Sequence, residues 1–101
     1  MKFGKLVRDK IPDIIRSKGE TAVTHIADDT EYQTKLREKV SEELAEFDAK
    51  PCAEEMADLQ EVCEALTKAH GISWEEVQEL KKKKREERGG FEQRIILDET
   101  T

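Results

Sequence analysis

Four carboxylates near the middle of the chain have the types and spacing of a divalent-metal site. Counted outward from the Lys50–Pro51 junction, Glu46 and Glu55 are each the fifth residue, and Glu43 and Asp58 are each the eighth. Because helices rise equally per residue, two antiparallel helices meeting at this junction would place each pair at one level. Helix axes roughly 8–10 Å apart let facing carboxylates converge on one ion. The spacing therefore predicts bound Mg²⁺, with Mn²⁺ as the alternative.

The helical phase of these acids supports the same interpretation. At about 100° per residue, Glu43 falls inside the apolar stripe of the first arm, and Glu55 projects from the apolar stripe of the second. Glu46 and Asp58 lie at the edges of the two stripes, whereas Glu42 points toward water. A charge on an apolar face is costly unless it is paired or metal-bound. We therefore interpret the inward acids as metal ligands rather than as a solvated charged face.

The flanking residues predict the two helices that must position the acids. Asp28 and Glu31 form a capping-box pattern, which predicts a helix that starts after Asp28 and runs to about residue 49. A second helix is expected from about residue 51 to 69, with Pro51 in the tolerated first turn and Gly71 beyond its end. The two helices would form an antiparallel hairpin.

Shorter elements surround this hairpin. A short helix is expected at about residues 11–18, and a third long helix after Ser73, which caps it together with Glu76. Residues 21–27 alternate and are rich in β-branched side chains, so they favour a short strand that could pair with residues 93–97 as a ribbon. The predicted fold is mainly all-α, in a single domain spanning residues 1–101.

Composition limits the classes of function that remain. A chain of 101 residues with 36% hydrophobic residues buries a modest core, so we expect oligomerisation to complete the helical bundle. The net charge of −6 argues against binding to a nucleic-acid polymer. The sequence has no segment of transmembrane length and no apolar signal-peptide core, which predicts no membrane association and a cytoplasmic location. The two cysteines lack partners at zinc spacing, so no zinc site is expected.

Basic residues flank the acidic segment on both sides in the sequence. Residues 1–19 and residues 81–88 each hold six basic side chains against two acidic ones. A carboxylate-bound metal facing lysine and arginine suits a polyphosphate, because the metal and the bases share its negative charge. Residues 81–88 are equally typical of a solvated helix end. The candidate phosphate-binding residues are Lys5, Arg8, Lys10, Lys84, Arg85 and Arg88.

These motifs resemble a known family of enzymes. The run Glu42-Glu43-Leu44-Ala45-Glu46, followed by Glu55-Met56-Ala57-Asp58, resembles the EE-x-x-E and E-x-x-D signature of the MazG-like all-α nucleoside triphosphate pyrophosphatases. KLVRDKIPDII at residues 5–15 and REERGGFEQRIIL at residues 85–97 look like the small house-cleaning subgroup, close to phosphoribosyl-ATP pyrophosphohydrolase. The resemblance covers nearly the whole chain, although the linker between Glu46 and Glu55 is shorter than in much of the superfamily.

The resemblance implies hydrolysis of a nucleoside triphosphate between the α- and β-phosphates, giving a monophosphate and pyrophosphate. Carried over by position, Glu43, Glu46, Glu55 and Asp58 would bind Mg²⁺. Glu42 or Glu46 would be the catalytic base that accepts the proton of the attacking water. A single hairpin covers one side of a nucleotide, so a homodimer or homotetramer is expected.

Three other interpretations remain open from the sequence. A di-iron or di-manganese bundle would also use facing acids, but it typically needs Glu-x-x-His, and neither His25 nor His70 follows a glutamate at that spacing. A non-catalytic regulatory or binding module of the same fold is the second. The third is phosphoribosyl-ATP pyrophosphohydrolase itself, which performs the same chemistry on another substrate.

Overall fold

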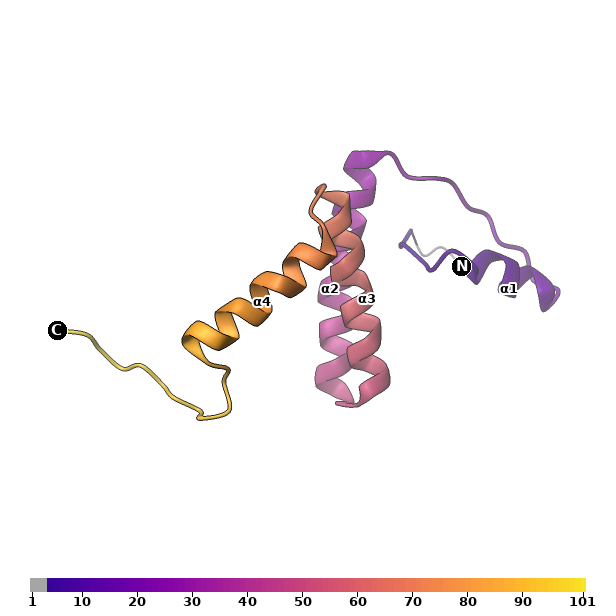
Figure 1. Cartoon of the computed structure of the whole chain (residues 1–101). Coiled ribbons are helices and arrows are strands. Elements are labelled where there is room, and N and C mark those ends of the chain that lie inside the picture. Colours follow the sequence, from indigo (N-terminus) through magenta and orange to yellow (C-terminus); the bar gives the residue numbers. More distant parts are fainter. Residues whose placement is uncertain (1–3) are drawn as a thin grey trace. The chain divides into compact units, whose positions relative to one another are not determined.

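The computed structural model describes residues 4–101, and this part of the chain contains four helices and no strand (Figure 1). The helices are α1 (Ile11–Ser17), α2 (Asp29–Ala49), α3 (Ala53–Ala69) and α4 (Trp74–Arg88). The mainly all-α class and the order of the helices are therefore confirmed. The predicted boundaries agree to within two residues, the largest difference being that α3 begins at Ala53 rather than at Pro51.

The chain divides into two compact units, one ending at Gly71 and the other running from Ile72 to Thr101. In the first unit, α2 and α3 form the predicted antiparallel hairpin, joined by the short turn at residues 50–52 (Figure 1). Leu36 on α2 is 1% exposed, and it is the one fully buried apolar side chain among the described residues. The hairpin is thus held by a small core.

A side-chain cap fixes the start of α2. Asp28 has an extended backbone, and its Oδ1 accepts a 2.9 Å hydrogen bond from the backbone N–H of Glu31. This bond satisfies one of the amide groups that a helix leaves unpaired at its first turn. It explains why α2 begins where the capping pattern predicted.

Replacing Asp28 with alanine should lower the free energy of unfolding by about 1 kcal/mol, because the cap is lost and an amide is left unpaired. Urea unfolding followed by circular dichroism measures this change. Asp29→Ala removes a neighbouring acid that makes no side-chain cap bond, so it should cost only a few tenths of a kcal/mol, about the value of a charge near the helix N-terminus. Equal losses in the two variants would contradict a capping role.

The expected β ribbon is a wrong prediction for the described residues, since neither residues 21–27 nor residues 93–97 form a strand. Val23 and Ile26 are 95% and 96% exposed, so these two apolar side chains pack against nothing in the part of the chain that the structure describes. In the second segment, Arg94 has a positive φ of 62°, which belongs to a turn rather than to a strand. A strand needs a neighbour to pair its backbone groups, and β propensity alone does not provide one.

The second unit consists of α4 and the residues that follow it. Ser73 Oγ accepts a 3.4 Å hydrogen bond from the N–H of Glu76, which confirms the predicted cap. The helix ends at Arg88 and is followed by Gly89, whose φ of 85° lies in the region that favours glycine. Beyond it, Phe91 and residues 95–97 are exposed. None of the described helices is long and apolar enough to cross a membrane.

Candidate functional site: an acidic cluster on the hairpin

The hairpin brings three of the four predicted metal ligands together. Glu43 on α2 and Glu55 and Asp58 on α3 each offer an oxygen, and these three oxygens lie within 4.8 Å of one another. Carboxylate oxygens are the ligands that Mg²⁺ and Ca²⁺ prefer in proteins. Of the two pairs matched by equal counting from the turn, Glu43 and Asp58 converge, whereas Glu46, the counterpart of Glu55, is not in the group.

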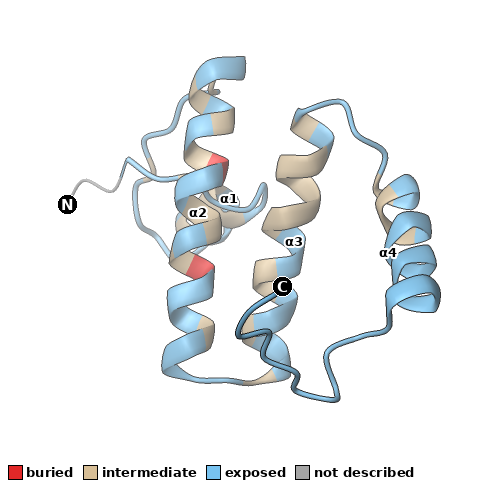
Figure 2. Ribbon diagram, turned by 90° about the vertical axis from the view of Figure 1, so that its left-hand side faces the viewer, coloured by how far each residue is buried: buried red, intermediate tan, exposed pale blue. Residues whose placement is uncertain are grey.

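Glu43 is the most unusual member of this cluster, because it is 6% exposed. Leu36 and Glu43 are the buried residues of α2, and buried positions are coloured red in Figure 2. Glu43 Oε2 is buried without a hydrogen-bond donor, and so is Glu55 Oε2. Leaving buried carboxylate oxygens unpaired costs about 1–3 kcal/mol each, and more when they are charged. Two such oxygens from facing helices fit a bound cation better than they fit a purely structural core.

The environment of Glu43 raises the pKa of its carboxyl group above the ordinary value. Burial is the largest cause, followed by the hydrogen bond and the charge of Glu46, and Lys39 acts in the opposite direction. Two carboxylates can share a hydrogen bond only when one of them holds a proton. When both are ionised, Glu43 Oε2 has no donor. A divalent cation in this position would supply the missing positive charge.

Glu46 and Glu42 lie around the cluster rather than within it. Glu46 is exposed and does not belong to the group of three converging acids, although it neighbours Glu43. Glu42 is only partly exposed, and its Oε1 lies 3.5 Å from both Lys5 Nζ and Lys39 Nζ. The expectation that Glu42 points into water is therefore corrected, since nearby lysines hold it. The proton-accepting role assigned to Glu42 or Glu46 stays a prediction.

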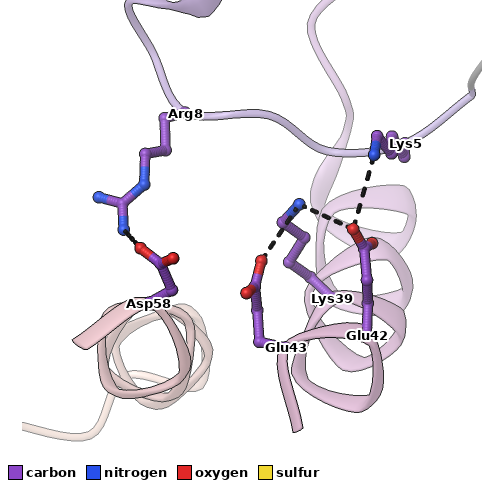
Figure 3. A network of polar contacts seen from close by, with 6 residues as sticks. All are labelled: Lys5, Arg8, Lys39, Glu42, Glu43 and Asp58. Carbon is purple, nitrogen blue, oxygen red and sulfur yellow. Dashed lines mark hydrogen bonds and ion pairs between the residues drawn. The ribbon is translucent and has the colours of Figure 1, made fainter. Parts of the chain in front are cut away.

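Two of the predicted phosphate-binding residues contact the acids directly (Figure 3). Arg8 Nη2 donates a 2.7 Å hydrogen bond to Asp58 Oδ1, and Lys5 pairs with Glu42. Lys10 forms no ion pair with the described residues and occupies the N-cap position of α1. The N-terminal segment therefore brings positive charge to the acidic residues of the hairpin.

Sequence reasoning missed Lys39, which is central to this network. Its Nζ lies 3.5 Å from Glu42 Oε1 and 3.5 Å from Glu43 Oε1, and its side chain is largely buried. Lysines three and four residues before a glutamate on a helix reach it routinely. That spacing was the signal that could have found Lys39 from the sequence.

The remaining basic candidates belong to the second unit. Lys84, Arg85 and Arg88 are exposed on α4. Arg85 Nη2 donates a 2.6 Å hydrogen bond to Glu92 Oε1, which holds the pKa of that carboxyl group below its ordinary value. Their role as phosphate ligands stays a prediction.

No family model matches the chain, and no solved structure matches it. A protein of Mycolicibacterium smegmatis described as uncharacterized is 47% identical over 47 residues, which is 46% of this chain and 48% of that protein. The match thus spans about half the length of this relative. The chemistry of the acidic cluster is therefore the ground on which a function is inferred.

Proposed function

We propose that this protein is a Mg²⁺-dependent nucleoside triphosphate pyrophosphohydrolase of the MazG-like kind, acting in clearance of the nucleotide pool. The observation that supports the proposal most strongly is Glu43, a nearly buried carboxylate that has one unpartnered oxygen and that converges with Glu55 and Asp58. Three of the five signature acids form this cluster, and the other two, Glu42 and Glu46, lie beside it. Binding of the metal alone would not require the basic residues that lie beside this cluster.

The donor set fits a hard divalent cation. Glu43, Glu55 and Asp58 would hold it, with Glu46 next to them as a further ligand or as the base. When bound, the ion would polarise the phosphate oxygens and lower the pKa of a coordinated water. Glu42 or Glu46 would accept the proton of that water. Arg8 and Lys5 would contact the phosphates and offset their charge.

We also propose that the active form is a homodimer or homotetramer. Leu36 is the one fully buried apolar side chain in the described part of the chain, whereas Leu44 and Met56 on the hairpin are about half exposed. Small domains with so little core usually gain stability from association. A second copy would also enclose a nucleotide that one hairpin leaves open to water.

The test of the function is pyrophosphate release from a panel of nucleoside triphosphates and phosphoribosyl-ATP, with Mg²⁺ or with a chelator. We expect release in Mg²⁺ only. Asp58→Asn should lower the rate about 100-fold or more, because metal ligands contribute several kcal/mol to the barrier. Glu54→Gln is the matched control, since Glu54 is an exposed acid of α3 outside the cluster.

The outcomes separate the candidate functions. Release from phosphoribosyl-ATP alone would assign the protein to the histidine-pathway reaction instead of pool clearance. Binding of Mg²⁺ and nucleotide without release from any substrate would overturn the enzymatic proposal and favour a binding module. Equal activity of Asp58→Asn and wild type would remove the cluster from the mechanism.

A further inference from the structure

The segment from Gly4 to Lys10 carries positive charge onto the acidic cluster from outside the hairpin. Figure 3 shows Arg8 and Lys5 extending from this one segment toward different helices, Arg8 to Asp58 on α3 and Lys5 to Glu42 on α2. Arg8 and Asp58 are 50 positions apart in the sequence, so this is a tertiary contact and not a local one. We call residues 4–10 the strap.

Arg8 donates a hydrogen bond to a carboxylate, Asp58, that the cation would also bind. Asp58 is one of the three converging acids, and its Oδ1 already accepts the Arg8 guanidinium at 2.7 Å. Glu43 and Glu55, by contrast, each keep one oxygen without a donor. A divalent cation that enters the cluster must therefore share Asp58 with Arg8 or displace it.

The pair is weak enough to be displaced. The side chains of Arg8 and Asp58 are 58% and 37% exposed, and ion pairs in such positions are worth about 0–1 kcal/mol. Displacement would leave the guanidinium in water beside the bound cation. A polyphosphate held by that cation would then offer it new acceptor oxygens, which arginine can bind through two parallel hydrogen bonds.

We propose that Arg8 of the strap competes with the divalent cation for Asp58. Once the cation has displaced it, the Arg8 guanidinium binds the phosphates of the bound nucleotide. This inference rests on the proposed function and specifies how its two ligands are coupled. In the wild type, Arg8 weakens binding of the metal alone and strengthens binding of the metal–triphosphate complex. The strap thereby favours binding of the metal–triphosphate complex over binding of the free metal ion.

The test measures both affinities by titration calorimetry on the chain of 101 residues. The probes are Mn²⁺ alone, and Mg²⁺ with an α,β-methylene nucleoside triphosphate that cannot be hydrolysed at the scissile bond. Arg8→Gln should bind Mn²⁺ about 3- to 5-fold more tightly than wild type, because about 1 kcal/mol of lost competition corresponds to about 5-fold. It should bind the metal–triphosphate complex about 3- to 10-fold more weakly, because the phosphates lose a guanidinium partner.

Arg37→Gln is the matched control. Arg37 is exposed on α2 and has no ion pair among the residues that the structure describes, so this variant makes the same change in net charge without touching the cluster. We expect less than about a 2-fold change in either affinity, as distant surface charges are screened at physiological ionic strength. Circular dichroism melts of both variants check that folding is preserved.

Opposite changes in the two affinities of Arg8→Gln, absent in Arg37→Gln, would support the strap. If the wild type binds Mn²⁺ but Arg8→Gln matches Arg37→Gln in both titrations, the proposed competition between Arg8 and the cation is overturned. The proposed function then stands. If the wild type binds neither Mn²⁺ nor the metal–triphosphate complex, the proposed function fails, and the strap fails with it.

Discussion

Glu43→Gln is expected to stabilise the metal-free protein while removing most of its stabilisation by divalent cations. In the wild type, the buried carboxylate carries one oxygen without a donor and faces two further acids. A glutamine of the same shape removes the charge, and its amide can donate to a neighbouring carboxylate. We expect a gain of about 1–2 kcal/mol in the free energy of unfolding in chelator. For a domain of this size that is a rise of about 4–16 °C in Tm.

The pH dependence of this gain follows from the raised pKa of Glu43. The folded state binds the Glu43 proton more tightly than the unfolded state does. The stability that this group contributes is therefore complete below its unfolded pKa and is lost as pH rises through its folded pKa. Glutamine does not titrate. The advantage of Glu43→Gln should thus be absent at low pH, grow as pH rises through that window and stay constant above it.

The cation response should have the opposite sign. A ligand that binds only the folded state at 100 times its Kd adds about 2.7 kcal/mol to the wild type. Glu43→Gln should lose most of that increment, so that saturating Mg²⁺ makes the wild type the more stable protein.

Differential scanning calorimetry in chelator and in Mg²⁺, across pH 4 to 8, measures both effects. Glu38→Gln is the control, because Glu38 is an exposed acid of α2 that pairs with Lys35. It should change stability by less than about 0.5 kcal/mol under either condition. A wild type that is more stable than Glu43→Gln in chelator would show that the cluster is a structural network and not a cation site.

The helices and the positions of the acids could be predicted from the sequence because their causes are local. Asp28 and Ser73 cap the following helices through residues three positions ahead, and the sequence displays that spacing directly. The matched counting around Lys50–Pro51 placed Glu43 and Asp58 at one level, since the rise of a helix is constant. Periodicity is enough for both inferences.

The remaining features depend on long-range contacts, which the helical or strand periodicity of a sequence does not predict. The Arg8–Asp58 pair links positions 50 residues apart, and neither segment has a sequence pattern that predicts contact with the other. Glu46 lies beside the three converging acids and not among them. Its helical phase put it at the edge of the apolar stripe, and a side chain at such an edge can point either inward or outward. Residues 21–27 have the composition of a strand but pair with none of residues 4–101, because strand pairing is a property of the whole fold.

Leu36→Ala is expected to produce the largest loss of stability of any single substitution in the hairpin. Leu36 is 1% exposed, and truncating a fully buried leucine costs about 2–5 kcal/mol through lost burial and the cavity left behind. The free energy of unfolding of a folded protein is only about 5–15 kcal/mol in total. We therefore expect a substantial unfolded fraction at 37 °C, measured by circular dichroism and urea titration.

Leu44→Ala is the informative partner of that variant, because Leu44 is 47% exposed in the single chain. Were the hairpin stable by itself, this truncation should cost less than about 1 kcal/mol, as is usual for surface positions. Under the proposed oligomerisation, a second copy covers the hairpin, so the loss should be larger and should depend on protein concentration. Sedimentation velocity at several concentrations tests this directly. A monomeric wild type, with Leu44→Ala as stable as wild type, would leave Leu36 as the centre of a self-sufficient hairpin and remove the need for a second subunit at the site.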